Sequence, residues 1–222
     1  MKKKGIIFGG IIVAIIMVVI ASAAVIQTDN EALNLDMSRT HGTVTTAMGS
    51  PILGSESAPI TIVEFGDYQC HQCYNWFHNT KDAIVENYIE TGKANLVFVD
   101  LAFLGRDSPK AAAATYCAEE QGKYWEFHDQ LYNFQEEIDS GWANNERLKA
   151  IAQSLELDNE LFDSCLDSGK FSKRVQFNIN EAKKHGATGT PTFIIINSDG
   201  EQQKLVGAQP YSVFQNVLES MI

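Results

Sequence analysis

The feature that most constrains this chain is a pair of cysteines, Cys70 and Cys73, separated by His71 and Gln72. The pair follows an apolar, β-branched run over residues 60–65 that predicts a buried strand, and it opens a segment that predicts a helix. Two thiols at this spacing can close a small disulfide ring. The free N–H groups at a helix start favour an anion, which lowers the pKa of the first thiol and makes it a nucleophile. The motif therefore predicts a site of thiol–disulfide exchange.

A structural disulfide or half of a zinc site is the competing interpretation of this motif. Zinc would need two further ligands at short spacing. The remaining cysteines, Cys117 and Cys165, lie 44 and 92 residues beyond Cys73 and form no second C-x-x-C pair. We therefore expect a catalytic dithiol with no metal and no organic cofactor.

The N-terminus predicts export of the rest of the chain. Lys2, Lys3 and Lys4 precede a run of 22 uncharged residues, 5–26, which is long enough to cross a bilayer as a helix. The lysines should remain in the cytoplasm, so that the catalytic domain lies outside it on a membrane anchor. Cleavage as a signal peptide at Ala21-Ser22-Ala23 is the alternative, and would give a secreted or periplasmic protein. Residues 1–27 are thus assigned to an anchor or signal segment.

Charge narrows the class of partner for the exported part. The chain has a formal net charge of −11, and residues 27–222 hold 28 acidic and 14 basic residues, a net of −14. This charge disfavours nucleic acid as a partner. Residues 28–55 are polar, contain three glycines and a proline, and predict a linker. The folded domain is then expected over 56–222.

The residue pattern over 56–222 predicts a strand–helix–strand unit, followed by a block of helices, a β-hairpin and a last helix. The first strand and helix lead to a second strand over 95–101, which should be parallel to the first. Apolar residues at helical spacing predict further helices between about 104 and 184, with Asn144 or Asn145 and Asp158 as caps. Strands are expected over 192–197 and 202–206, and a helix over 210–221. The pattern indicates an α/β sheet with an inserted helical domain.

Cys117 and Cys165 fall on the inner faces of two of the inserted helices. In an exported chain we favour a structural disulfide between them, because such compartments permit disulfides. Two buried free thiols and a second redox-active pair are the alternatives. His128 and His185 are expected to be ordinary surface or capping residues.

Three separated segments resemble the DsbA-like branch of the thioredoxin superfamily. Residues 63–73 (VEFGDYQCHQC) resemble its active-site segment, residues 189–193 (GTPTF) its cis-proline loop, and residues 121–128 (QGKYWEFH) a segment of its helical insertion. The resemblance covers about 50–222. It implies a thioredoxin fold with an inserted helical domain, Cys70 as the nucleophile and Cys73 as the buried resolving thiol. It also implies that Pro191 is cis and that the Thr190 backbone binds an extended substrate.

Two further side chains are assigned to the site. The resemblance suggests that Glu64 is a buried carboxyl beneath the dithiol that relays the Cys73 proton; an acid facing solvent at the strand end is the alternative. His71 directly after Cys70 can stabilise the thiolate by charge or hydrogen bond. The dipeptide His71-Gln72 differs from the Pro-His of the best-known strong oxidant of the family, so the reduction potential is not carried over.

Together these features predict an extracytoplasmic thiol:disulfide oxidoreductase that introduces disulfides into exported proteins through Cys70 and Cys73. Reduced or unfolded exported polypeptides would be substrates, and a membrane redox partner of the DsbB or VKOR type would reoxidise the pair. A monomer is expected. A reductase or isomerase kept reduced by a membrane donor is the first alternative. A non-catalytic holdase that binds extended peptides is the second, and the intact C-x-x-C motif argues against it.

Overall fold

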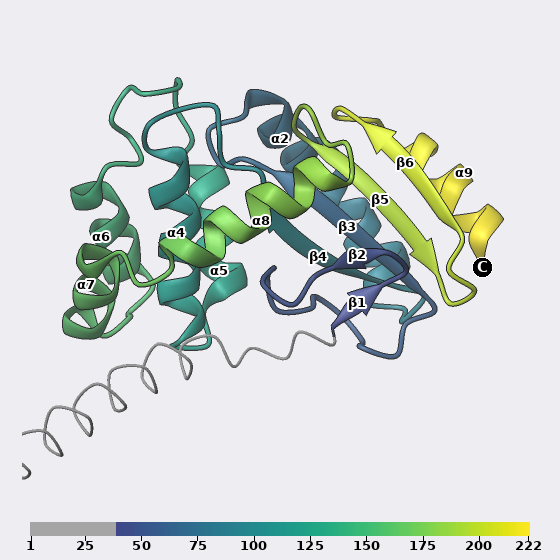
Figure 1. The fold of residues 1–222 in the computed structure, drawn as a ribbon, viewed down its shortest axis with the longest axis horizontal. Helices are drawn as coiled ribbons and strands as arrows, with labels where there is room; N and C mark the ends of the chain where they lie inside the picture. Colours follow the sequence, from purple (N-terminus) through teal and green to yellow (C-terminus); the bar gives the residue numbers. More distant parts are fainter. Residues whose placement is uncertain (1–38) are drawn as a thin grey trace, which may run out of the picture. The chain divides into compact units, whose positions relative to one another are not determined.

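A computed structural model describes residues 39–222, and their contacts define one compact unit over Ser38–Ile222. Its main sheet has four strands in the order β4-β3-β5-β6 (Figure 1). These are β3 (Ile60–Gly66), β4 (Ala94–Asp100), β5 (Thr192–Asn197) and β6 (Gln202–Val206). β3 runs parallel to β4 and antiparallel to β5, and β5 pairs with β6 as a hairpin. The predicted α/β sheet and its parallel first unit are confirmed.

Strands β3, β4 and β5 are buried on both faces, and successive side chains along each strand point to opposite faces. Ile60 and Ile62 point to a core that contains Trp76 and Phe214. Val63 and Phe65 of β3 point to the opposite face, into a second core that they share with the inserted helices. The helix predicted from residue 70 to about 90 is one helical segment with π turns, made of α2 (His71–Trp76), η1 (Phe77–Lys81), α3 (Asp82–Ile84) and η2 (Val85–Ile89). It covers the first core together with α9 (Tyr211–Met221).

Five helices form the insertion between β4 and β5. They are α4 (Ser108–Glu119), α5 (Tyr124–Asn133), α6 (Asn145–Ser154), α7 (Asn159–Ser168) and α8 (Ser172–Lys184). α6 and α7 lie at the end of the unit away from the β5-β6 hairpin (Figure 1). Asn144 caps α6 and Asp158 caps α7, each through its side-chain oxygen. The predicted helical insertion is therefore present over its expected range.

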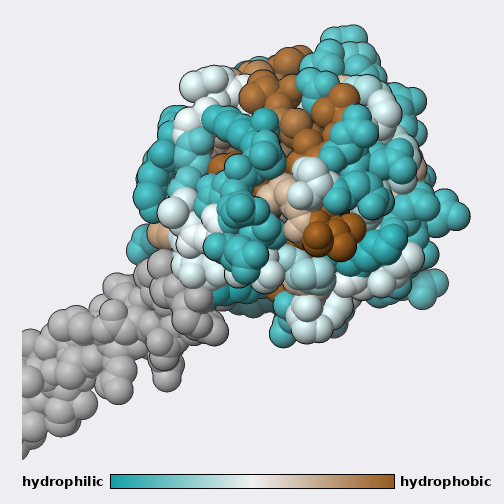
Figure 2. Space-filling view, turned by 90° about the vertical axis from the view of Figure 1, so that its right-hand side faces the viewer, coloured by the Kyte–Doolittle hydropathy of each residue, from teal (hydrophilic) through white to brown (hydrophobic). Residues whose placement is uncertain are grey.

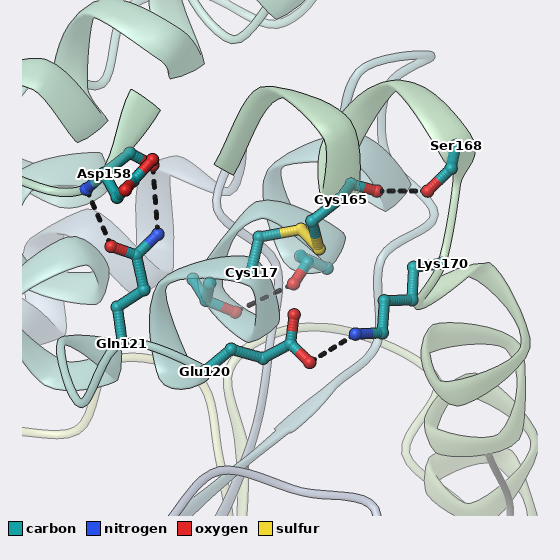
Figure 3. The surroundings of a disulfide bond; sticks show 9 residues. Cys117, Glu120, Gln121, Asp158, Cys165, Ser168 and Lys170 are labelled. Carbon is teal, nitrogen blue, oxygen red and sulfur yellow. Dashed lines mark hydrogen bonds and ion pairs between the residues drawn. A yellow bond between two sulfur atoms is a disulfide. The ribbon is translucent and has the colours of Figure 1, made fainter. Parts of the chain in front are cut away.

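A disulfide links α4 to α7 within this insertion (Figure 3). It joins Cys117 to Cys165, whose Cα atoms are 5.8 Å apart. Hydrogen bonds join the same two parts of the chain nearby: the Gln121 side chain donates to the Asp158 carbonyl at 3.2 Å and accepts from the Asp158 N–H at 2.7 Å. The insertion is thus held by both covalent and polar links.

The prediction of a linker over 28–55 is wrong for residues 40–55, which are part of the folded unit. Residues 40–45 form a small hairpin of β1 (Thr40–His41) and β2 (Val44–Thr45), and the segment after it packs on the sheet. The Ser50 N–H donates to the Phe98 carbonyl at 2.8 Å, and Leu53 bridges Leu96. The segment lacks apolar periodicity because it packs small residues against a strand edge. The folded unit therefore includes residues 39–55, ahead of the boundary expected at residue 56.

The two outer strands of this sheet are protected from pairing with other chains in different ways. Residues 50–53 bind along β4, whereas β6 is mostly exposed and carries Gln202, Gln203 and Lys204. Polar and charged side chains on an edge discourage further strand addition. On the side of the unit that bears β6 and α9, apolar side chains gather in patches among polar ones (Figure 2). Val206 and Ile222 are among the exposed apolar residues.

The predicted anchor or signal segment lies outside the described residues, as does the first part of the linker. Within residues 39–222 no helix has the length and apolar character needed to cross a bilayer.

Candidate active site

Cys70 and Cys73 lie where the chain leaves β3 and enters α2. Cys70 is the N-cap of α2, with an extended backbone (φ −83°, ψ 117°). Its N–H donates to the Asp67 carbonyl at 2.9 Å, and its carbonyl accepts from Tyr74 at 3.0 Å. Both cysteines are unpaired thiols in this structure. Cys70 is 6% exposed and Cys73 is fully buried, so an incoming sulfur can reach Cys70 but not Cys73.

The surroundings of Cys70 favour its thiolate. Hydrogen bonding from the Cys73 thiol is the largest cause and lowers the pKa of Cys70 to about 6. Thr190 and the backbone N–H groups of Cys73 and Gln72, at the helix start, act in the same direction, whereas burial opposes them. Cys70 is therefore largely ionised at neutral pH.

Cys73 has the opposite character. Burial raises its pKa well above the ordinary value, and the hydrogen bond to Cys70 and the negative charge of Cys70 raise it further. The charge of Glu64 contributes in the same direction. The two thiols thus differ in both accessibility and acidity.

The loop before β5 completes the site. The Thr190–Pro191 peptide bond is cis, and the Cys70 Sγ lies 3.2 Å from the Thr190 carbonyl oxygen. Pairing of Phe65 with Thr192 at the end of β3 brings the two segments together, although they are 120 residues apart in sequence. The Pro191 carbonyl accepts from the Gly207 N–H at 2.8 Å, which ties the loop to the end of β6.

Glu64 is buried in the sheet near the dithiol, with 1% of its surface exposed. Neither carboxyl oxygen has a hydrogen-bond partner among residues 39–222. Burial is the main cause that raises the pKa of Glu64 to about 8. The positive charge of Lys81 lowers this pKa, and the negative charge of Cys70 raises it. Lys81 is itself buried, and its Nζ bonds to Asp129 of α5 at 2.6 Å. Glu64 therefore keeps its proton to a higher pH than an exposed carboxyl does.

His71 lies on the outer face of the helix start. Its ring is exposed and stacks parallel to that of Tyr74, with 5.8 Å between the ring centroids. His71 therefore lies at the solvent side of the site.

The prediction that His128 is a surface or capping residue is wrong. Its side chain is 1% exposed and lies among aromatic rings. The Tyr68 hydroxyl lies 2.9 Å from its Nδ1. Burial and the charge of Lys81 lower the pKa of His128 well below its ordinary value, so the ring is neutral. A single histidine in an amphipathic helix gives no sign in the sequence of which neighbours enclose it.

Other contacts to the site were missed because they join distant segments through the backbone. Gln135, just after α5, donates to the carbonyl oxygens of Tyr68 and Cys70. The Asp67 carboxylate accepts from the N–H groups of Phe103 and Leu104. Within residues 39–222 no group of three or more His, Cys, Asp or Glu side chains is arranged to hold a metal ion.

Comparison with known proteins is consistent with this geometry. The thioredoxin family model matches residues 46–219. Probable disulfide bond formation protein D of Bacillus anthracis is 31% identical over 147 residues, which is 64% of this chain and 68% of that protein. Disulfide bond formation protein D of Bacillus subtilis is 30% identical over 150 residues, 66% and 68% of the two chains.

Solved structures give the same assignment. Oxidised BdbD from Bacillus subtilis superposes with a TM-score of 0.72 and 25% identity, over 82% of this chain and 97% of that one. Alpha-DsbA1 from Wolbachia pipientis gives a TM-score of 0.67 and 28% identity, over 77% and 89%. The chain therefore belongs to the thioredoxin family and is a DsbA-like thiol–disulfide oxidoreductase.

Proposed function

We propose that the Cys70–Cys73 pair is the redox centre and that it works as an oxidase, introducing disulfides into other proteins. The observation that carries this proposal is the stabilised thiolate of Cys70, whose pKa is lowered to about 6 by the Cys73 thiol and the helix-start N–H groups. Stabilising the thiolate stabilises the reduced form, and a disulfide whose reduced form is stable is a stronger oxidant. A low pKa of Cys70 also makes it a good leaving group from a mixed disulfide.

The reaction begins with the enzyme as the Cys70–Cys73 disulfide. A substrate thiolate attacks Cys70 Sγ, forming a mixed disulfide and breaking the bond to Cys73, which leaves with the electron pair. A second substrate thiolate attacks the substrate sulfur and expels Cys70 as a thiolate. The substrate has lost two electrons as a new disulfide, and the enzyme has gained them as a dithiol. An electron acceptor then reoxidises the pair.

Glu64 supplies the proton that this reaction needs at Cys73. The pKa of Cys73 is raised well above its ordinary value, so it must be protonated as it leaves. Glu64 is buried near it with a pKa raised to about 8, and is therefore mainly protonated at neutral pH. Its burial favours a role in catalysis over the solvent-facing alternative. His71, at the solvent side, would interact with the incoming substrate and the Cys70 thiolate.

Thr190 and Pro191 are proposed to bind the substrate backbone. The 3.2 Å distance between Cys70 Sγ and the Thr190 carbonyl oxygen supports a role for this loop beside the reacting sulfur. An extended segment that delivers a thiolate to Cys70 would pass along the same loop. The Cys117–Cys165 disulfide is proposed to be structural, since it lies in the insertion between α4 and α7.

The cellular setting is proposed from the N-terminal sequence. The uncharged run over 5–26 after three lysines supports a membrane anchor with the catalytic domain outside the cytoplasm, with secretion after cleavage as the alternative. Substrates would then be exported, reduced polypeptides, and a membrane partner of the DsbB or VKOR type would accept the electrons. The enzyme would act as a monomer.

Direction is tested by the reduction potential of residues 27–222, measured by equilibration in glutathione buffers. A potential near about −120 to −180 mV supports the oxidase. A potential near about −270 mV would favour a reductase or isomerase kept reduced by a membrane donor. Activity in cells that survives Cys70→Ser would instead favour the peptide-binding holdase.

A further inference from the structure

The turn that carries Cys70 is held in place by the inserted helical region. The Asp67 carboxylate accepts from the N–H groups of Phe103 and Leu104 at 2.8 and 2.9 Å, in the segment between β4 and α4. The Gln69 side chain donates to Ser108 Oγ at 3.0 Å, at the start of α4. Two side chains of the turn are therefore anchored on the first part of the insertion.

The segment between α5 and α6 contributes the remaining contacts, and we name residues 134–143 the α5–α6 loop. The Asp139 N–H donates to Gln69 Oε1 at 2.8 Å, and Asp139 Oδ1 accepts from the Arg106 N–H at 2.8 Å. The fit is close, because a Cβ on Gly105 would lie 2.2 Å from Gln69 Nε2 and 2.7 Å from Asp139 Oδ1. Glycine at position 105 leaves the space that these two side chains occupy.

Gln135 in this loop reaches the backbone of the nucleophile itself. Its Nε2 donates to the Tyr68 carbonyl at 2.5 Å and to the Cys70 carbonyl at 3.2 Å. The Cys70 carbonyl oxygen carries partial negative charge close to the sulfur of the same residue. A donor amide on that oxygen offsets the charge and fixes the orientation of the Cys70 peptide group.

That orientation determines what Cys70 Sγ can contact. Cys70 is an extended N-cap, fixed at its N–H by Asp67 and at its carbonyl by Tyr74 and Gln135. In this orientation of the Cys70 backbone, the Cys70 sulfur accepts hydrogen bonds from the backbone N–H groups of Gln72 and Cys73 at the start of the helix. Rotation of the peptide group would weaken these contacts.

We propose that Gln135 is a positioning residue for thiol–disulfide exchange, through which the inserted helical region holds the Cys70 sulfur against the start of α2. The sequence gives no sign of this role, and it applies whether the enzyme oxidises or reduces its substrates. Gln135 acts through the Cys70 backbone and touches no reacting atom.

The test is the pH dependence of Cys70 alkylation by iodoacetamide in the reduced full chain, with the modified residue identified by mass spectrometry. The titratable groups near Cys70 are Cys73 and His71 on α2, Glu64 on β3, Asp67 in the turn and Tyr132 on α5. Burial raises the pKa values of Cys73, Asp67 and Tyr132, and Glu64 titrates near 8. Because Gln135→Met leaves all of these groups in place, a difference in the Cys70 alkylation midpoint between the two proteins reports the effect of the Gln135 amide.

Gln135→Met keeps the length of the side chain and removes the donor. The midpoint should move to higher pH, and the alkylation rate at pH 6 should fall about threefold to tenfold, as for loss of one hydrogen bond. The dithiol–disulfide equilibrium in glutathione should shift toward the disulfide by a similar factor. Gln153→Met, on an exposed position of α6, should change neither.

An unchanged midpoint and an unchanged glutathione equilibrium in folded Gln135→Met would overturn the proposal, even if the free energy of unfolding fell. Should that variant not fold, Gln135→Leu is a second change that removes the amide donor. It should raise the midpoint to a similar extent, because no hydrogen bond can then reach the Cys70 carbonyl oxygen. No shift in that variant would equally reject the positioning role.

Discussion

The carboxyl group of Glu64 and the thiol of Cys73 are both buried, and the charge of the first raises the pKa of the second. Neither Glu64 oxygen has a hydrogen-bond partner among the described residues. An unpartnered buried carboxyl costs stability, because burial without hydrogen bonds disfavours its charged form. The burial of Glu64 therefore disfavours folding, and this cost agrees with the role proposed for Glu64 at Cys73.

Glu64→Gln should slow thiol–disulfide exchange at pH 7 by about a hundredfold or more, because a general acid or base typically contributes about 10²–10⁴-fold. It should also remove the change in rate near pH 8, where Glu64 titrates. Stopped-flow measurement of mixed-disulfide resolution from pH 5 to 9 checks both. Glu86→Gln, on an exposed position, is the matched control. A profile identical to that of the unmodified enzyme would eliminate Glu64 as a proton carrier.

Glu64 should also make folding stability depend on pH. Its pKa is about 8 when folded and 4.5 when unfolded, so the folded state binds the proton more tightly. The penalty is absent below pH 4.5, grows as pH rises, and is complete above about pH 8. Glu64→Gln should therefore stabilise the oxidised protein by roughly 3–5 kcal/mol at pH 9 and by little at pH 4. Urea unfolding at the two pH values measures this difference; equal gains at both would contradict it.

Lys81→Met should raise the pKa of Glu64 above about 8, because the Lys81 charge is the cause that lowers it. The partner left behind, Asp129, has a side chain that is 42% exposed, so water can solvate its carboxylate. The midpoint of the pH–rate profile should move upward while Cys70 alkylation at pH 6 changes little. A midpoint that moved downward would show that another group controls the profile.

Cys73→Ala should raise the pKa of Cys70 above about 6, since hydrogen bonding from Cys73 is the largest cause of its low value. Alkylation of Cys70 by iodoacetamide should then require a higher pH for half-maximal rate. In the unmodified reduced enzyme, Cys73 should remain unalkylated below pH 8, because it is buried and its pKa is raised. Equal labelling of both thiols in the folded enzyme would contradict this assignment.

Removing the second disulfide should affect stability and leave exchange intact. The bond between Cys117 and Cys165 closes a loop across 48 positions, and a loop of this length is worth about 4 kcal/mol in the chain-entropy model. Cys117→Ala combined with Cys165→Ala should lower the free energy of unfolding by about that amount. The reduction potential of Cys70 and Cys73 should not change. A shifted potential would instead point to a second redox-active pair.

The sequence predicts the strands and the dithiol best. The run over 192–197 and its partner over 202–206 appear in the structure at the residues expected, because β-branched residues and a tight turn are strong local signals. Asp158 caps α7 as predicted, and Asn144, one of the two candidates with Asn145, caps α6, because capping is also local. The chemistry of the C-x-x-C pair depends on a helix start, which the sequence also marks.

The remainder depends on contacts between distant segments. Residues 46–50 show no apolar periodicity, yet they pack against β4, where the Ser50 N–H donates to the Phe98 carbonyl. Gln135 acts on a backbone carbonyl 65 positions away, and no pattern of residue types encodes such a bond. Local propensity does not predict a hydrogen bond between a side chain and the main chain of a distant helix, strand or loop.

The pairing of β3 with β5 has a consequence for biogenesis. Glu64 and Cys70 are made early, whereas Thr190 and Pro191 follow after more than a hundred residues. During synthesis from the N-terminus, the dithiol therefore exists for some time without the loop that faces it. A growing chain already carries Cys70, Cys73 and Cys117 before the partner of Cys117 has been added. The complete site, with the Thr190–Pro191 loop beside Cys70, therefore forms only after the last strands have been made.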